Sequence, residues 1–146
     1  MKFEGTVEIK APRQRVWDFL MDPNQVGPCG PGVESIEVID ETHFKATAKV
    51  GIGFISARFV VNLEFAERDA PDRAVIKAHG QAPGSAVDAT ATMALRDGPD
   101  GTTIMDWSAD VLIAGSIASV GARLIEGTAN KMIGQSFDCI KTKLEA

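Results

Sequence analysis

Residues 85–97, SAVDATATMALRD, alternate in character along their whole length and decide the fold. This period of two predicts a half-buried β-strand, because successive side chains of a strand point to opposite faces. The face that carries Met93 and Leu95 is the apolar one, yet its central positions are Ala89 and Ala91. A very small side chain thus lines a predicted interior, and the reason for it determines the functional interpretation.

Six further segments alternate in the same way and are predicted strands. They are residues 2–10, 33–39, 44–50, 53–67, 74–81 and 102–113. From residue 33 onward, short turns rich in Gly, Pro and Asp join successive segments. Such short connections favour an antiparallel meander, because parallel strands need long crossovers.

Helical patterns occupy most of the remaining chain. Pro12 suits the first turn of a helix through RQRVWDFLM (residues 13–21), and Asp22-Pro23 ends that helix and caps a short second one. One long helix is predicted over residues 116–144, and its apolar arc exceeds the ~100° stripe that a single packed surface requires. The predicted fold class is therefore α+β. A curved seven-stranded antiparallel sheet wraps around the long C-terminal helix, with two short helices after the first strand, in one domain of residues 1–146.

The composition is that of a globular protein, with 45% hydrophobic and 24% charged residues and a net charge of -5. The acidic balance argues against nucleic-acid binding. The charged N-terminus does not read as a signal peptide, and no run approaches the roughly 18 apolar residues of a membrane span. Cys29 and Cys139 fit no metal or redox spacing, so we expect free structural thiols in a reducing cytoplasm.

Small side chains dominate the inward positions of the predicted strands, and none of these positions is charged. The small inward residues are Gly5, Ala46, Ala48, Ala57, Ala74, Ala78, Gly80, Ala89, Ala91 and Ala109. Two explanations remain open: the helix and sheet approach closely, or the interior holds a cavity for a ligand. The wide apolar arc of the helix favours the cavity, as do its own small residues Gly121, Ala129 and Cys139.

A cavity with this lining offers no acid–base chemistry. The chain has no Tyr, and its charged candidates are predicted to point outward; these are His43, His79, Asp88, Asp106 and Asp110. The interior suits an apolar ligand held by burial, which contributes ~2.5 kcal/mol per 100 Å² before entropy costs. No catalytic residue, metal site or cofactor is predicted.

The predicted ligand contacts come mainly from inward strand positions and one face of the long helix. They are Cys29, Phe54, Phe59, Val61, Ile76, Ala78, Ala91, Met93, Met105, Trp107, Leu124, Thr128, Met132 and Gln135. Thr128 and Gln135, seven residues apart, would hydrogen-bond a polar head group such as a ring carbonyl. The alternative is that each of them bonds a backbone group or a neighbouring strand.

Two glycine-rich features also have alternative interpretations. GPCGPG (residues 27–32) is predicted to be irregular, and it forms either a plain loop or a flexible lip over the cavity mouth. Gly121, Gly127 and Gly134 are expected to permit close packing of the long helix, and a bend in the helix is the alternative.

Four stretches carry a resemblance to a known family by their order and spacing. They are FEGTVEIKAPRQRVWDFLMDP (residues 3–23), GPGVESIE (30–37), KVGIGFISARF (49–59) and GSIASVGARLIEGTANKM (115–132). The chain resembles the family of the carbon monoxide dehydrogenase G-subunit, within the helix-grip superfamily of START-related lipid-transfer proteins and the birch pollen allergen. The resemblance implies a helix-grip fold with a hydrophobic cavity between the sheet and the last helix. It also implies an accessory protein of molybdenum-containing hydroxylases, not the redox enzyme.

Some members of that family carry a C-terminal extension suited to membrane contact. The chain ends at Ala146 without one, so we expect at most peripheral contact at the inner face of the membrane.

Three functions are compatible with these patterns. The first, which we expect, is a non-catalytic carrier that binds a quinone or lipid and serves a molybdenum hydroxylase such as carbon monoxide dehydrogenase. The second is an enzyme such as a polyketide cyclase or dehydratase, which needs a cavity-facing Asp, Glu or His. The third is an assembly or maturation factor that acts through its surface.

Overall fold

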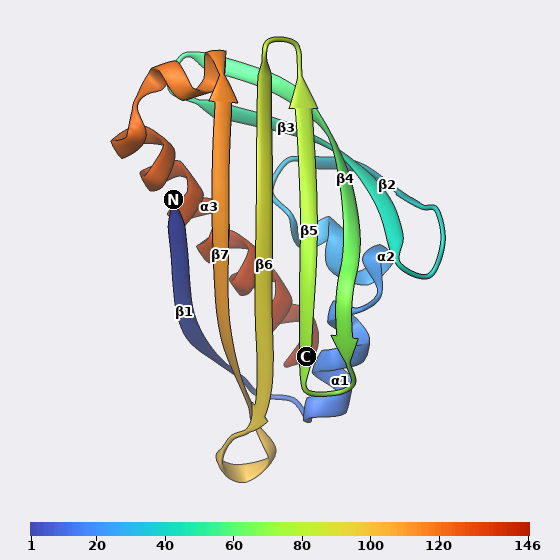
Figure 1. Cartoon of the computed structure of the whole chain (residues 1–146). Helices are drawn as coiled ribbons and strands as arrows, with labels where there is room; N and C mark the ends of the chain where they lie inside the picture. The colour runs from blue at the N-terminus through green and yellow to red at the C-terminus, as the bar shows by residue number, and fades with distance from the viewer.

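A computed structural model describes residues 1–146. Seven strands form one antiparallel sheet in the order β1-β7-β6-β5-β4-β3-β2. The strands are β1 (Lys2–Ile9), β2 (Val33–Val38), β3 (His43–Ile52), β4 (Ile55–Asp69), β5 (Arg73–Ala82), β6 (Ser85–Asp97) and β7 (Thr103–Gly115). The helices are α1 (Arg13–Leu20), α2 (Pro23–Val26) and α3 (Ala122–Leu144), with 3₁₀ turns η1 (Gly27–Cys29), η2 (Pro99–Gly101) and η3 (Ser116–Val120). The predicted α+β architecture is confirmed (Figure 1). None of the helices is both long and apolar enough to cross a lipid bilayer.

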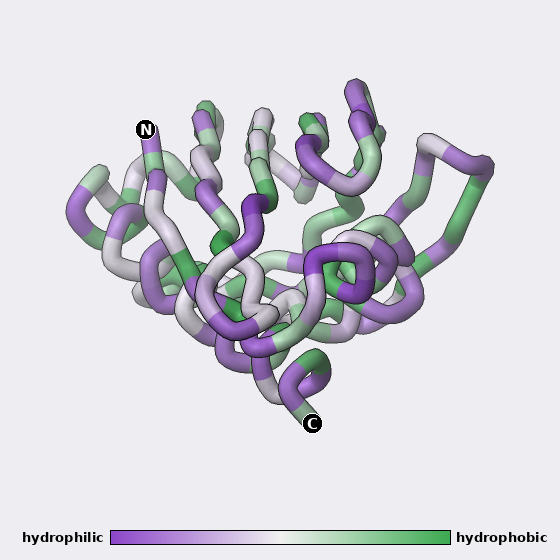
Figure 2. Tube along the Cα trace, turned by 90° about the horizontal axis from the view of Figure 1, so that it is seen from below, coloured by the Kyte–Doolittle hydropathy of each residue, from purple (hydrophilic) through white to green (hydrophobic).

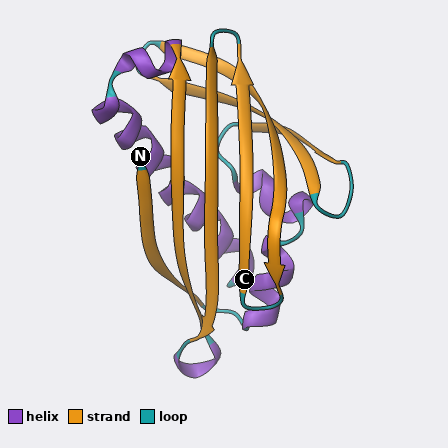
Figure 3. Cartoon of the chain, in the orientation of Figure 1, coloured by secondary structure: helices purple, strands orange, loops and turns teal.

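The sheet is a meander from β2 to β7, and β1 closes the far edge by pairing with β7. Its curved surface has the helices on one side, as Figures 2 and 3 show. The register places Ala89 of β6 opposite Ala78 of β5, and Ala91 of β6 opposite Ala109 of β7. Small side chains from three neighbouring strands therefore adjoin on the inner face of the sheet.

The two short helices carry the chain from one edge of the sheet to the other. Trp17 of α1 is buried in the core, and the Asp22 carboxylate accepts a hydrogen bond from the Asn24 N–H at 3.0 Å, which caps α2 as predicted. The buried Thr103 hydroxyl of β7 donates to the Ala11 carbonyl at 2.7 Å. This bond fixes the start of α1 against the sheet.

The C-terminal helix begins later than predicted. Residues 116–120 form the separate turn η3, and α3 starts only at Ala122. Gly121 between them has a φ of 99°, a conformation that favours glycine. A side chain placed at Gly121, Gly127 or Gly134 would meet nothing within 4 Å. The expectation of close packing at these glycines is wrong, because Gly121 breaks the helix and the other two face open space.

The apolar core has two parts, separated along the sheet. The larger part includes Ile9 and Met105 and lies where α1 and the end of α3 meet the sheet. The smaller part consists of Ile52, Phe59 and Ile117. Inward residues between them, such as Ala89, are only half-buried. The middle of the interface between sheet and helix is therefore not filled by side chains.

Candidate functional site

A cavity of about 560 Å³ lies between the inner face of the sheet and α3. Strands β3 to β7 form one wall and α3 the other, and the volume is within the range of roughly 300–1,000 Å³ seen for ligand sites. It brings together six of the predicted contacts, namely Phe59, Val61, Ala78, Trp107, Thr128 and Met132. Ala89 and Ala109 also line it, so the small strand residues create space and do not serve close helix packing.

A second cavity of about 400 Å³ continues toward α1 and α2. It collects the predicted contacts Cys29, Ile76, Ala91, Met93 and Met105, and it shares Trp107 with the larger cavity. Ser136, Phe137 and Ile140 of α3 also line both. The Trp107 and Phe137 rings lie 5.6 Å apart between their centroids. The two cavities are therefore compartments of one apolar site, with an aromatic pair where they meet.

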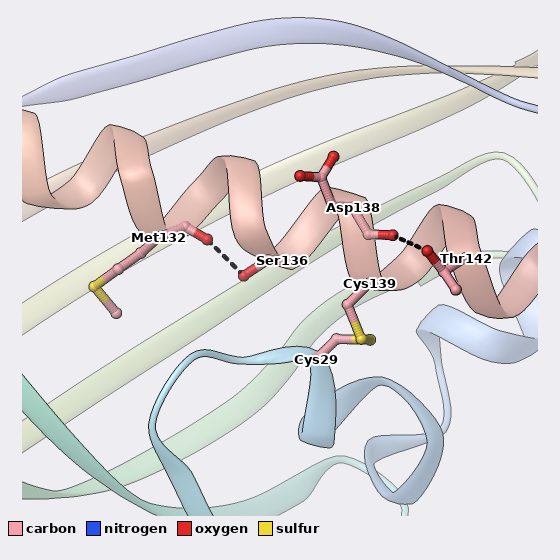
Figure 4. Close-up of a disulfide and its surroundings, with 6 residues drawn as sticks. All are labelled: Cys29, Met132, Ser136, Asp138, Cys139 and Thr142. Carbon is pink, nitrogen blue, oxygen red and sulfur yellow. Dashed lines mark hydrogen bonds between the residues drawn. A yellow bond between two sulfur atoms is a disulfide. The ribbon is translucent and has the colours of Figure 1, made fainter.

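Polar side chains in the site are few, and the two that face it lie on α3. The Ser136 hydroxyl donates to the Met132 carbonyl at 2.9 Å (Figure 4). Thr128 lines the larger compartment, and its hydroxyl makes no hydrogen bond within the chain, so the alternative of a backbone bond is not observed. Thr92 and Ser108 border the smaller compartment but belong to the outward phase of their strands, so it is their backbone that borders it.

No Asp, Glu, His, Lys or Arg lines either compartment. The perturbed carboxylates lie elsewhere on the exposed surface. A hydrogen bond from Arg58 lowers the pKa of Glu34, and hydrogen bonds from Arg96 and Thr6 lower the pKa of Asp106. No group of three or more His, Cys, Asp or Glu side chains is arranged to hold a metal ion. The site therefore offers apolar burial and hydroxyl groups. It contains no side chain that could act in general acid–base catalysis.

Cys29 and Cys139 form a disulfide, with their Cα atoms 5.4 Å apart (Figure 4). The expectation of free thiols is wrong for both residues. They are 110 positions apart, so no local pattern signals the bond, and only the fold brings η1 against α3. Because disulfides are rare in reducing compartments, the pairing removes the basis on which a reducing location was predicted. Cys29 borders the smaller compartment, and its sulfur there is part of the disulfide and not a free thiol.

The disulfide fastens the segment of residues 27–32, which we call the lip. The lip is more regular than predicted, because Gly27–Cys29 form a 3₁₀ turn. Gly30 lines both compartments and Pro31 lines the larger one. The interpretation as a lip therefore fits better than that of a plain loop, although this lip is bonded to the helix beneath it.

Three predicted contacts lie outside both compartments. Phe54 is 92% exposed at the turn between β3 and β4, and Leu124 is 42% exposed at the start of α3. Gln135 is exposed because a step of seven residues falls about 20° short of two helical turns. Thr128 already stands at the edge of the buried stripe, so this drift carries Gln135 into solvent. Ser136, four residues after Met132, takes the predicted polar position instead.

Comparisons with known proteins identify structures of similar fold. No curated protein matches the chain. A conserved protein from Geobacillus kaustophilus has a similar structure, with a TM-score of 0.92 and 25% identity over 99% of this chain and 95% of that chain. The Zhui aromatase/cyclase from Streptomyces sp. R1128 has a TM-score of 0.74 and 14% identity, over 99% and 93%. A START superfamily protein from Mycobacterium smegmatis has a TM-score of 0.71 and 11% identity, over 99% and 97%. The last two likenesses concern the fold alone.

The sequence comparison is more specific than the structural one. Residues 5–145 match the family described as the carbon monoxide dehydrogenase G-subunit (CoxG). The matched range includes every residue that lines the two compartments. The family and the fold together support a ligand-binding helix-grip protein, and the resemblance noted in the sequence is confirmed. The chain belongs to the carbon monoxide dehydrogenase G-subunit (CoxG) family.

Proposed function

We propose that the chain is a non-catalytic carrier that holds one lipophilic molecule in the two-compartment cavity. The observation that carries the proposal is an apolar space with hydroxyl groups on one wall only. A hydrocarbon chain that spans both compartments gains free energy in proportion to the area it buries. The unpartnered Thr128 hydroxyl can donate a hydrogen bond to a carbonyl on the head group.

A quinone with an isoprenoid tail is the proposed ligand, and a molybdenum hydroxylase is the proposed partner. The family description names carbon monoxide dehydrogenase. In this proposal, an enzyme of this kind passes its electrons to a membrane quinone. A carrier that shields the quinone tail from water would allow the quinone to move between the membrane and the enzyme. A quinone ring offers carbonyl acceptors and the tail suits the apolar walls, whereas a phospholipid would also bring a charged head group.

A catalytic role has less support from the residues. The Streptomyces protein of similar fold is an aromatase/cyclase, and such folds do host enzymes. Here no side chain in the compartments titrates, since the Cys29 sulfur is bonded to Cys139. Proton transfer to a bound substrate would therefore need a group that the site lacks.

The proposed place of action is the cytoplasmic face of the membrane, where a quinone is accessible. The Cys29–Cys139 bond is the observation against that location, because disulfides are rare in reducing compartments. Alkylation of free thiols in freshly lysed cells, followed by mass measurement of the chain, tests it. An unmodified, bonded pair argues against a reducing location.

Ligand extraction tests the carrier function directly. The purified chain is incubated with phosphatidylcholine vesicles that contain ubiquinone and menaquinone, separated by gel filtration and extracted with organic solvent. Mass spectrometry should then find about one quinone per chain. Recovery of phospholipid alone contradicts the quinone assignment, and recovery of neither lipophile contradicts the carrier function.

A further inference from the structure

Phe54 is the most exposed large apolar side chain, and it stands at the tip of the turn between β3 and β4. The β5–β6 turn and the connection from β7 to α3 lie at the same end of the molecule, at the top of Figure 1. The Ser116 N–H donates to the Gly84 carbonyl at 2.8 Å, which joins two of these segments. Leu124 of α3 lies against Gly53 of the β3–β4 turn, which joins the third segment to the other two. Residues 50–57, 80–87 and 111–122 therefore form one end, which we call the apolar pole.

The apolar pole contains no Lys, Arg, Asp or Glu, although charged residues make up 24% of the chain. It carries the two most exposed large apolar side chains, Phe54 and Leu112, which are 92% and 72% exposed. The β4–β5 and β6–β7 turns at the opposite end carry four acids, namely Asp69, Asp72, Asp97 and Asp100. Arg13 pairs with Asp72 at 2.6 Å and with Asp97 at 3.5 Å at that end. The molecule thus has one uncharged, apolar end and one charged end.

Two unpaired cations stand at the rim of the apolar pole. Arg123 and Lys131 line a surface depression with Leu124 and Thr128, and no acidic residue lines it. Neither cation takes part in an ion pair. Thr128 also lines the larger compartment, so the depression adjoins the site itself. An anionic head group in this depression would meet positive charge beside the ligand cavity.

We propose that the apolar pole is a docking surface for a lipid bilayer that contains anionic phospholipid. The apolar ring of Phe54 is buried at the boundary between head groups and acyl chains, and Arg123 and Lys131 contact lipid phosphates. The reverse orientation would bring the charged turns of the far end against the bilayer and take them out of water, so it is disfavoured. The favoured orientation turns the Thr128 side of the cavity toward the lipid. The docking does not depend on which lipophile the cavity holds.

Vesicle co-sedimentation tests the docking. The chain is mixed with vesicles of phosphatidylcholine alone or with added phosphatidylglycerol, and it should sediment with the latter, less so at high salt. Phe54→Asp should weaken binding by at least about tenfold, because the apolar contact is lost and a negative charge is added. Ile39→Asp is the matched control. Ile39 is 57% exposed, but it lies in the β2–β3 connection, at the end of β3 that is remote from Phe54. That variant should bind like the wild type.

The cations are tested with a second pair of variants. Combined Arg123→Glu and Lys131→Glu should remove the preference for phosphatidylglycerol, whereas Lys143→Glu in the last turn of α3 should keep it. All the substituted side chains are exposed, so circular dichroism should show unchanged folds.

Three results overturn the proposal. They are no sedimentation of the wild type with either vesicle, equal losses in Phe54→Asp and Ile39→Asp, or a Phe54-dependent self-association in solution without vesicle binding. The last result would make the pole an interface between copies of the chain. Quinone uptake from detergent should be unchanged in Phe54→Asp, so a failure of docking is distinguishable from a failure of the carrier function.

Discussion

Trp107 of β7 and Phe137 of α3 face each other across the cavity, with ring centroids 5.6 Å apart and planes inclined by 43°. Both residues line both compartments. The pair therefore forms the boundary that a ligand must pass to occupy the full length of the site. This geometry makes ligand shape, and not only apolar area, a determinant of binding.

Phe137→Ala should join the compartments and shift binding toward bulkier or longer tails. The change removes one ring of the boundary and should lower the free energy of unfolding by about 2–3 kcal/mol, less than a fully buried Phe because Phe137 is half-buried. Mass spectrometry after incubation with an equimolar mixture of short-tail and long-tail quinones measures the shift. Phe19→Ala is the control, since Phe19 is buried but lines neither compartment. Unchanged tail selection in Phe137→Ala would contradict the role of the pair.

Ala89→Phe should abolish ligand uptake without destabilising the fold. Ala89 lines the larger compartment, and a phenyl ring there occupies ligand space while gaining contacts with the walls. Solvent extraction should recover at least about tenfold less quinone, and the Tm of the ligand-free variant should not fall. Thr90→Phe places the same ring on the exposed outer face one residue later and should leave uptake intact. Equal uptake in the two variants would mean that the ligand binds elsewhere.

Loss of the Cys29–Cys139 bond should loosen the lip. The bond closes a long loop of chain, and its removal should lower the free energy of unfolding by about 2–4 kcal/mol. Hydrogen–deuterium exchange should rise at residues 27–33 when Cys29→Ala and Cys139→Ala are combined, or when the wild type is reduced. The single variant Cys29→Ala under reducing conditions separates the bond from side-chain packing. Exchange that is the same with and without the bond would show that the lip is held by its other contacts.

Asp40→Asn should destabilise the β2–β3 hairpin in a pH-dependent manner. The Asp40 carboxylate accepts hydrogen bonds from the Thr42 N–H at 2.9 Å, the His43 side chain and the His43 N–H, which lower its pKa from 3.8 to about 2. A carboxylate with a lowered pKa in the folded state stabilises the fold above its unfolded-state pKa. That contribution disappears as the pH falls through about 2.

Urea unfolding at several pH values measures this difference. Wild type should exceed Asp40→Asn in stability at neutral pH, and the two should converge in strong acid. Glu41→Gln removes a neighbouring carboxylate that accepts none of these hydrogen bonds and serves as the control. A difference that grows on acidification would show that Asp40 acts in the opposite sense.

The strands were predictable because their alternation is local and strict. Residues 85–97 form β6 with the predicted bounds, and the inward Phe59, Val61 and Ala78 do line the cavity. The helix face was harder, since a drift of about 20° over seven residues moves Gln135 off the line of Thr128 and into solvent, and Ser136 lines the cavity instead. Phe54 was misplaced because a turn residue follows no periodic pattern.

The remaining features depend on the fold as a whole. The disulfide joins residues that are 110 positions apart, and the division of the cavity depends on Trp107 and Phe137 meeting from two different layers. Neither relationship leaves a mark on any single stretch of sequence.

The most direct test of the central claim uses Trp107 as a reporter inside the cavity. The chain has two tryptophans, so Trp17→Phe leaves only Trp107 to emit. Titration of this ligand-free variant with a short-tail quinone should quench the emission saturably at about one quinone per chain, and the quinone should be recovered chemically unchanged. Absence of saturable quenching, or conversion of the quinone into a product, would contradict the claim that the chain binds a lipophile without reacting with it.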